Sequence, residues 1–82
     1  MSCFVYIIKC MDDSYYTGIT SSLSRRIKEH NLRIKSCLQI SKIPVKLVYW
    51  EKYNTRIEAA MREKEIKGWS RIKKEKLISS LH

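Results

Sequence analysis

The stretch FVYIIKC, residues 4–10, and the stretch YYTGI, residues 15–19, decide the fold of this chain. The first stretch is apolar on both of the faces that a strand would have, which is typical of a central strand. The second stretch carries aromatic and β-branched residues around Gly18, which also favours a strand. Residues 11–14 (MDDS) supply turn chemistry between them, so the two stretches are expected to form a hairpin.

The pairing register of this hairpin decides which side chains share a face of the sheet. If even-numbered residues pair with even-numbered residues, Tyr6, Tyr16 and Gly18 lie on one face. A slip of one residue would separate the two tyrosines. A strand glycine often marks a place where a ligand or another backbone comes close. These residues also fit a simpler hypothesis, in which the tyrosines only pack and the glycine marks a bulge.

Composition and charge restrict the partners. The chain has 82 residues, of which 44% are hydrophobic, so one globular domain with a thin core is expected over residues 1–82. The net charge of +9, from 17 basic and 8 acidic residues, favours a polyanion, with nucleic acid first and an anionic membrane surface second. The three cysteines form no Cys-x-x-Cys pair, which predicts no zinc site or disulfide framework and fits an intracellular compartment, either cytoplasm with nucleoid or nucleus. The N-terminal apolar run is too short for a signal peptide or a membrane span.

A capping cluster, residues 20–22 (TSS), precedes a helix expected over residues 23–31. Leu23, Ile27 and His30 form one stripe of this helix. Arg26 borders the stripe one turn before His30, whereas Arg25 points toward solvent or a distant phosphate. Taken alone, Arg26 as a surface arginine and His30 as a packing histidine are the simpler interpretations.

The remaining elements follow from periodicity and caps. Residues 32–43 have no clean period and either extend the helix or form a loop with a short helical turn before Pro44. Residues 45–53 alternate as a third strand. A capping box at Thr55 and Glu58 predicts a helix that runs to about residue 67 and stops at Gly68. Ser70 is expected to cap a last helix over residues 71–81.

Glu63 stands apart from the other charges of the expected helix. Most of those charges, Arg62 among them, occupy one arc, whereas Glu63 projects between Ala59 and Ala60 toward the sheet. Because an unpaired buried carboxylate is costly, Glu63 needs a partner. A metal ion, Lys67 or an arginine would each satisfy it.

Together these features resemble the GIY-YIG nucleases, and most closely the small stand-alone members of that family. Residues 5–7 (VYI) stand where the family has Gly-Ile-Tyr, and residues 16–18 (YTG) stand for Tyr-Ile-Gly. Arg26 occupies the position of the family arginine in the first helix, and His30 stands at its Tyr-or-His position one turn later. Residues 44–49 (PVKLVY) and 59–67 (AAMREKEIK) look like the third-strand and metal-helix signatures, with Glu63 at the metal-binding position.

The resemblance implies an α+β fold, with a three-stranded antiparallel sheet flanked by about three helices. It also implies hydrolysis of a DNA phosphodiester by water with one divalent ion, Mg²⁺ or Mn²⁺. Glu63 would hold the ion, and Arg26 would stabilise charge on the phosphate. Tyr6 would position or deprotonate the attacking water, either in a cationic pocket or through a relay to His30, and Tyr16 would orient phosphate or water.

The resemblance further implies contacts with DNA, with branched or damaged DNA of repair or recombination among the candidates, and a targeting partner protein is an option. The residues expected to contact nucleic acid are Gly18, Arg25, Arg33, Lys35 and Lys67. The chain departs from the family at Val5, at Ile19 and in residues 31–43, which lack the Gly-rich loop of the stand-alone members. No membrane partner is expected, and the oligomeric state stays open.

Two other classes of function compete with the nuclease hypothesis. One is a non-catalytic nucleic-acid-binding module on the same fold, and the other is a basic protein adaptor or membrane-surface module. Glu63 favours the nuclease, because binding alone does not require an acid at that position.

Overall fold

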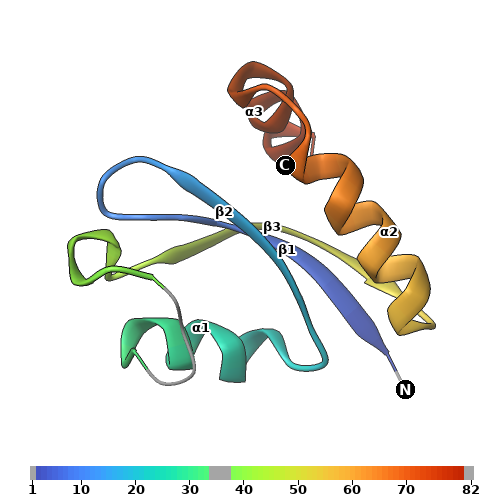
Figure 1. The fold of residues 1–82 in the computed structure, drawn as a ribbon, viewed down its shortest axis with the longest axis horizontal. Helices are drawn as coiled ribbons and strands as arrows, with labels where there is room; N and C mark the ends of the chain where they lie inside the picture. The colour runs from blue at the N-terminus through green and yellow to red at the C-terminus, as the bar shows by residue number, and fades with distance from the viewer. Residues whose placement is uncertain (1, 34–37, 81–82) are drawn as a thin grey trace.

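The structure, a computed structural model, describes residues 2–33 and 38–80. This part of the chain folds into a three-stranded antiparallel sheet with helices on both faces (Figure 1). The strands are β1 (Cys3–Lys9), β2 (Tyr15–Thr20) and β3 (Lys46–Tyr53), in the spatial order β2-β1-β3. The helices are α1 (Leu23–Asn31), α2 (Arg56–Lys67) and α3 (Arg71–Ser79), with a short 3₁₀ helix η1 (Ile40–Lys42). The predicted α+β fold is confirmed.

Strand β1 lies in the middle of the sheet, as its two apolar faces predicted. Val5 and Ile7 are buried on the face covered by α2 and α3, in a cluster that includes Ala59. Tyr6 and Ile8 are buried on the opposite face, which α1 covers (Figure 1). The alternation of side chains along one strand therefore feeds two separate hydrophobic clusters.

The hairpin has the register that brings the tyrosines together. Tyr6 lies opposite Gly18, and Ile8 lies opposite Tyr16, so all four residues share the α1 face. The turn places Asp13 in the left-handed region, with φ of 68°, where an aspartate is tolerated better than most residues. The structure adopts the even-to-even pairing, one of the two registers that the sequence left open.

The helix boundaries follow the predicted caps. The side chains of Ser22, Thr55 and Ser70 accept backbone N–H groups at the starts of α1, α2 and α3. Helix α2 ends at Gly68, which has a right-handed φ of −82° rather than the left-handed value of many glycine caps. Residues 34–37 and 81–82 lie outside the described residues, so the expectations for Lys35 and for the end of the last helix are not tested there.

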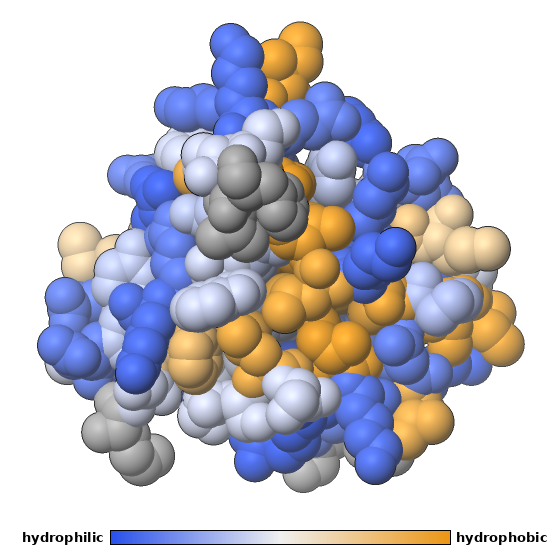
Figure 2. Space-filling model, turned by 180° about the vertical axis from the view of Figure 1, so that it is seen from behind, coloured by the Kyte–Doolittle hydropathy of each residue, from blue (hydrophilic) through white to orange (hydrophobic). Residues whose placement is uncertain are grey.

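Hydrophobic side chains also reach the surface. Seen from behind Figure 1, they gather in a strip across the middle of the molecule, bordered by hydrophilic side chains (Figure 2). None of the helices formed by the described residues has the length and apolar character that a membrane crossing requires.

Candidate active site

A buried pair of side chains, Tyr6 and His30, lies at the centre of the candidate site. The Tyr6 hydroxyl is 3.0 Å from Nε2 of His30, and the two residues are only 1% and 0% exposed. The Tyr16 ring meets the His30 ring edge-on, with 5.3 Å between the ring centroids. The hairpin register places both tyrosines under α1, and His30 belongs to the stripe of α1 that faces the sheet. Strand pairing and helix periodicity thus bring together residues that are 24 positions apart.

Gly18 makes room for the Tyr6 phenol. A Cβ atom at Gly18 would lie 2.6 Å from the Tyr6 hydroxyl and 2.8 Å from Cζ of the ring, closer than such atoms approach in proteins. The phenol therefore leans from the central strand across the edge strand β2. The close approach that the sequence suggested at Gly18 is made by a side chain of the protein itself.

Arg26 reaches the same phenol from α1. Its guanidinium lies 3.2 Å from the carboxylate of Glu29, one turn further along the helix. Burial alone would lower the pKa of Arg26, but hydrogen bonds with Tyr6 and Glu29 raise it instead. The site therefore holds a fixed positive charge beside the Tyr6 hydroxyl, as anion binding requires.

The electrostatics of the pair set its protonation state. Burial raises the pKa of Tyr6 above 10.0, and the negative charge of Glu63 is among the smaller contributions in the same direction. Burial also lowers the pKa of His30 below 6.5, and the positive charge of Arg26 lowers it further. At neutral pH the phenol is therefore protonated and the imidazole is neutral, so the imidazole can accept a proton.

Glu63 comes from the opposite layer of the fold. On α2, Ala59 and Ile66 are buried against the sheet, and Arg62 reaches toward β3. One residue further along a helix is a rotation of about 100°, which carries Glu63 to the other flank of α2, over β2. The Glu63 side chain is 21% exposed and lies 3.3 Å from the ammonium group of Lys67, which is 52% exposed. Of the partners that the sequence left open for Glu63, the structure records Lys67.

A single carboxylate is the metal ligand that this arrangement offers. Among residues 2–33 and 38–80, no group of three or more His, Cys, Asp or Glu side chains comes together to hold a metal ion. Mg²⁺ does not need such a cage, because it keeps several waters and commonly binds one or two carboxylates together with substrate phosphates. The Glu63–Lys67 ion pair lies near the surface, where a cation can replace the ammonium group. The donor set fits Mg²⁺ or Mn²⁺ and would not suit a zinc site.

Among the residues expected to contact nucleic acid, Gly18 is buried beneath the Tyr6 phenol, and the other described ones come from α1, the residues just after it and α2. Arg25 is exposed and donates to the Ser21 hydroxyl at 3.2 Å. Arg33 is exposed just past the end of α1, with φ of 57°. Lys67 pairs with Glu63, and Lys35 lies outside the described residues.

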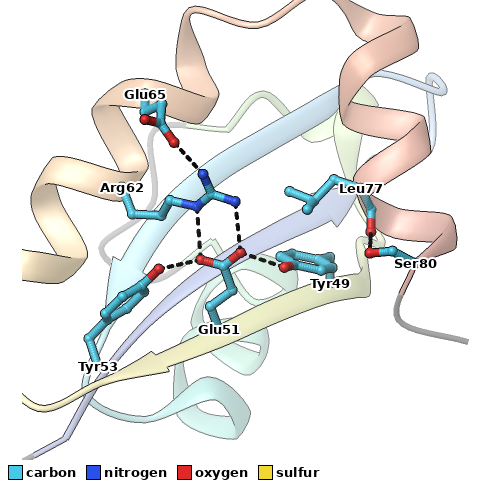
Figure 3. A network of polar contacts seen from close by, with 7 residues as sticks. All are labelled: Tyr49, Glu51, Tyr53, Arg62, Glu65, Leu77 and Ser80. Atoms are coloured by element: carbon cyan, nitrogen blue, oxygen red, sulfur yellow. Dashed lines mark hydrogen bonds and ion pairs between the residues drawn. The ribbon is translucent and has the colours of Figure 1, made fainter.

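A second polar network, which sequence reasoning missed, ties α2 to β3. Glu51 accepts hydrogen bonds from the hydroxyls of Tyr49 and Tyr53 and from two nitrogens of Arg62, at 3.0 and 3.1 Å (Figure 3). Burial, with hydrogen bonding to Glu51 acting in the same direction, raises the pKa of each tyrosine to about 12. Arg62, which the sequence placed on the arc of the helix that carries most of its charges, is half-buried. The signal for this network was an acid that alternates with two tyrosines along one face of a strand.

The comparisons with known proteins define the class of protein. The family model of the GIY-YIG catalytic domain matches residues 2–76. The chain therefore belongs to the GIY-YIG family, a nuclease-type family. The predicted membership is confirmed.

The relatives of the chain are small UPF0213 proteins. It is 46% identical over 76 residues to a UPF0213 protein of Staphylococcus saprophyticus, covering 93% of each chain. It is 43% identical over 74 residues to one of Haloquadratum walsbyi, covering 90% of this chain and 83% of the relative. Among solved structures, the solution structure of a UPF0213 protein from Bacillus halodurans has a TM-score of 0.62 at 39% identity, over 96% of this chain and 84% of the other. A protein from E. faecalis reaches 0.67 at 33% identity, over 100% of this chain and 88% of the other.

Proposed function

We propose that this protein is a metal-dependent endonuclease that hydrolyses DNA phosphodiester bonds with a water molecule as the nucleophile. What supports the proposal is the buried contact of 3.0 Å between the Tyr6 hydroxyl and Nε2 of His30, with Arg26 beside the same phenol. A protein that only binds nucleic acid has no need to bury a phenol against a neutral imidazole next to a fixed cation.

The pair acts as a proton relay. The Tyr6 oxygen accepts a proton from the attacking water while the Tyr6 hydroxyl proton moves to Nε2 of His30. Because burial raises the pKa of Tyr6, the phenol cannot act as a free phenolate at neutral pH and needs an acceptor. Because burial lowers the pKa of His30, that acceptor is available.

On this proposal the phosphate is held at the β2 edge of the sheet by groups from both layers, since the Tyr6 phenol lies over β2 on one face and Glu63 lies over β2 on the other. Arg26 binds a non-bridging oxygen and stabilises the negative charge that grows in the transition state. Tyr16, packed edge-on against His30, orients the phosphate or the water. Glu63 would hold Mg²⁺, which when bound neutralises phosphate charge and stabilises the leaving oxygen.

A plasmid-nicking assay tests this function. The parent protein should nick supercoiled DNA in Mg²⁺ and lose this activity in EDTA. Glu63→Ala should abolish nicking but leave DNA binding intact or slightly tighter, because the substitution removes a negative charge. Glu65→Ala is the matched control, since this residue lies on the same helix with its side chain 57% exposed, and it should nick like the parent.

The alternative function is a nucleic-acid-binding module without catalysis. Equal nicking by the parent and Glu63→Ala would eliminate the proposed role of Glu63. Metal-independent DNA binding with no nicking by the parent would favour the binding module. In either case binding should weaken steeply as salt is added, because phosphate contacts release counterions.

A further inference from the structure

None of the helices formed by the described residues covers one corner of the sheet, on the β3 side of the candidate site. Helix α1 starts just after β2 ends at Thr20, which pairs with Phe4. It ends beside the start of β3, where the Asn31 side chain accepts the Val45 N–H at 2.6 Å. The helix thus crosses this face diagonally, and it leaves the corner formed by the start of β1 and the end of β3 open.

Two aromatic side chains occupy this corner. The Phe4 and Trp50 rings are in an edge-to-face contact, with 5.9 Å between the ring centroids. Trp50 is 42% exposed, and neither residue belongs to the two hydrophobic clusters that form the core. Packing of the core therefore does not account for an aromatic pair at this position.

The pair lies next to the proposed catalytic residues. Trp50 is the cross-strand partner of Tyr6, and both point to the α1 face. Neighbouring strands are roughly 5 Å apart, so the exposed indole begins one strand spacing from the backbone of Tyr6. The Tyr6 phenol leans the other way, over Gly18 of β2. The indole and the Tyr6 hydroxyl therefore share one face of the sheet but lie on opposite sides of β1, about two strand spacings apart.

The charge around the pair suits a polyanion. Lys52 is exposed and pairs across the strands with Phe4, on the same face. Within the three described strands, the positions on this face carry no acidic residue. Glu51, the acid between Trp50 and Lys52, points to the other face and is engaged by Arg62.

We propose that the Phe4–Trp50 pair, through its exposed indole, stacks against an unpaired base of the substrate near the scissile phosphate. Bases inside a duplex are already stacked on their neighbours, whereas an unpaired base offers a free face to an aromatic side chain. The substrate class of this site is then nucleic acid with single-stranded nucleotides next to the cut, such as a gap or a flap. The cut itself rests on the proposed nuclease function, but the stacking does not.

Binding measurements in EDTA test the stacking without cleavage. Affinity for a labelled single-stranded oligo-dT and for a labelled blunt hairpin duplex is measured by fluorescence anisotropy. Trp50→Ala should weaken the single-strand complex roughly 5- to 150-fold, the equivalent of losing one stacked base, and change duplex affinity less than twofold. Trp50→Phe keeps an aromatic face and should stay within about threefold of the parent. Ile57→Ala, at another exposed hydrophobic side chain (74%), should change neither affinity.

Tryptophan fluorescence reports directly on the contact between Trp50 and a base. The chain has two tryptophans, so in Trp69→Phe the fluorescence comes from Trp50. Single-stranded oligo-dT should quench this emission, and the hairpin duplex should not. No quenching, no loss of single-strand affinity in Trp50→Ala, or an equal loss for both ligands would overturn the proposal. Sedimentation showing that the parent is a dimer and Trp50→Ala a monomer would also overturn it, because the corner would then be a contact between copies of the chain.

The two proposals can fail separately. A protein that binds single strands through Trp50 but never nicks DNA would retain the stacking and lose the nuclease function. If the parent nicks in a Glu63-dependent way and Trp50→Ala binds single strands normally, the nuclease function is retained and the stacking proposal is lost.

Discussion

Gly18→Ala should damage both stability and activity, because the new methyl group would lie where the Tyr6 phenol is. The added Cβ would be 2.6 Å from the Tyr6 hydroxyl, so the phenol must retreat about 0.8 Å to reach an ordinary contact of 3.4 Å. Tyr6 is 1% exposed and has little room for that movement. Overpacking of this kind costs about 1–3 kcal/mol, offset by about 0.5–1 kcal/mol from replacing a strand glycine. The midpoints of these ranges leave a net loss of about 1.25 kcal/mol, which corresponds to a melting temperature roughly 5–10 °C lower.

Thermal denaturation and plasmid nicking measure the two effects. Nicking should fall about 100-fold, since a displacement near 1 Å in a reacting group can cost that much. Gly68→Ala is the matched control, because its Cβ would meet nothing closer than 3.5 Å and its φ is −82°. That variant should melt and nick like the parent. A Gly18→Ala protein with an unchanged melting temperature and normal nicking would refute the placement of the phenol over Gly18.

Three further changes test other parts of the structure. Arg62→Ala should lower the free energy of unfolding, measured in urea, by about 2–4 kcal/mol, because it leaves the 17%-exposed Glu51 carboxylate without its cation. The double variant Glu51→Gln/Arg62→Met should recover much of this stability, and strictly additive losses would contradict the pairing. Nicking should rise with pH through a pKa below 6.5 and lose this dependence in His30→Gln, whereas a rise centred above 6.5 would argue against His30 as the acceptor. Stability should also depend on this residue, because the unfolded chain binds a proton at His30 at a higher pH than the folded chain does. The parent should therefore lose stability relative to His30→Gln as pH falls below about 6.5. Thr17→Val should leave stability unchanged or raise it by about 1 kcal/mol in thermal melts, because the buried Thr17 hydroxyl has no hydrogen-bond partner among residues 2–33 and 38–80. A clear loss of stability would indicate a bound water.

Local sequence patterns were sufficient to predict the strands and helices, and to place the candidate residues of the hairpin and of α1. A strand that is apolar on both faces predicted a central β1. The period of two showed that Tyr6 and Tyr16 share a face in one of the two possible hairpin registers, which is the register that the structure adopts. The stripe of the first helix predicted that His30 faces the sheet and that Arg26 borders it. These relations depend on residues that are close in sequence or joined by a tight turn, so periodicity captures them.

The rest of the site depends on how layers pack, which periodicity does not report. The position of Glu63 relative to Tyr6 depends on the rotation of α2 on the far face. The burial of Ala59 and Ile66 and the ion pair of Arg62 with Glu51 are the contacts that define this rotation. The exposure of Trp50 is set by the diagonal path of α1, which depends on where the chain re-enters the sheet. A pattern of alternating residues shows which face a side chain takes, but it does not show what covers that face.

The division of the site between two layers has a consequence for a chain that is still being made. Residues 2–33 supply the tyrosines, the arginine and the histidine, whereas Glu63 arrives only with the helix that docks on the reverse side of the sheet. A nascent or partly melted chain in which that helix has not yet docked lacks the carboxylate. On the proposed function, such a chain could bind DNA through its basic groups but could not cut it. Cleavage would therefore begin only after α2 has docked on the sheet.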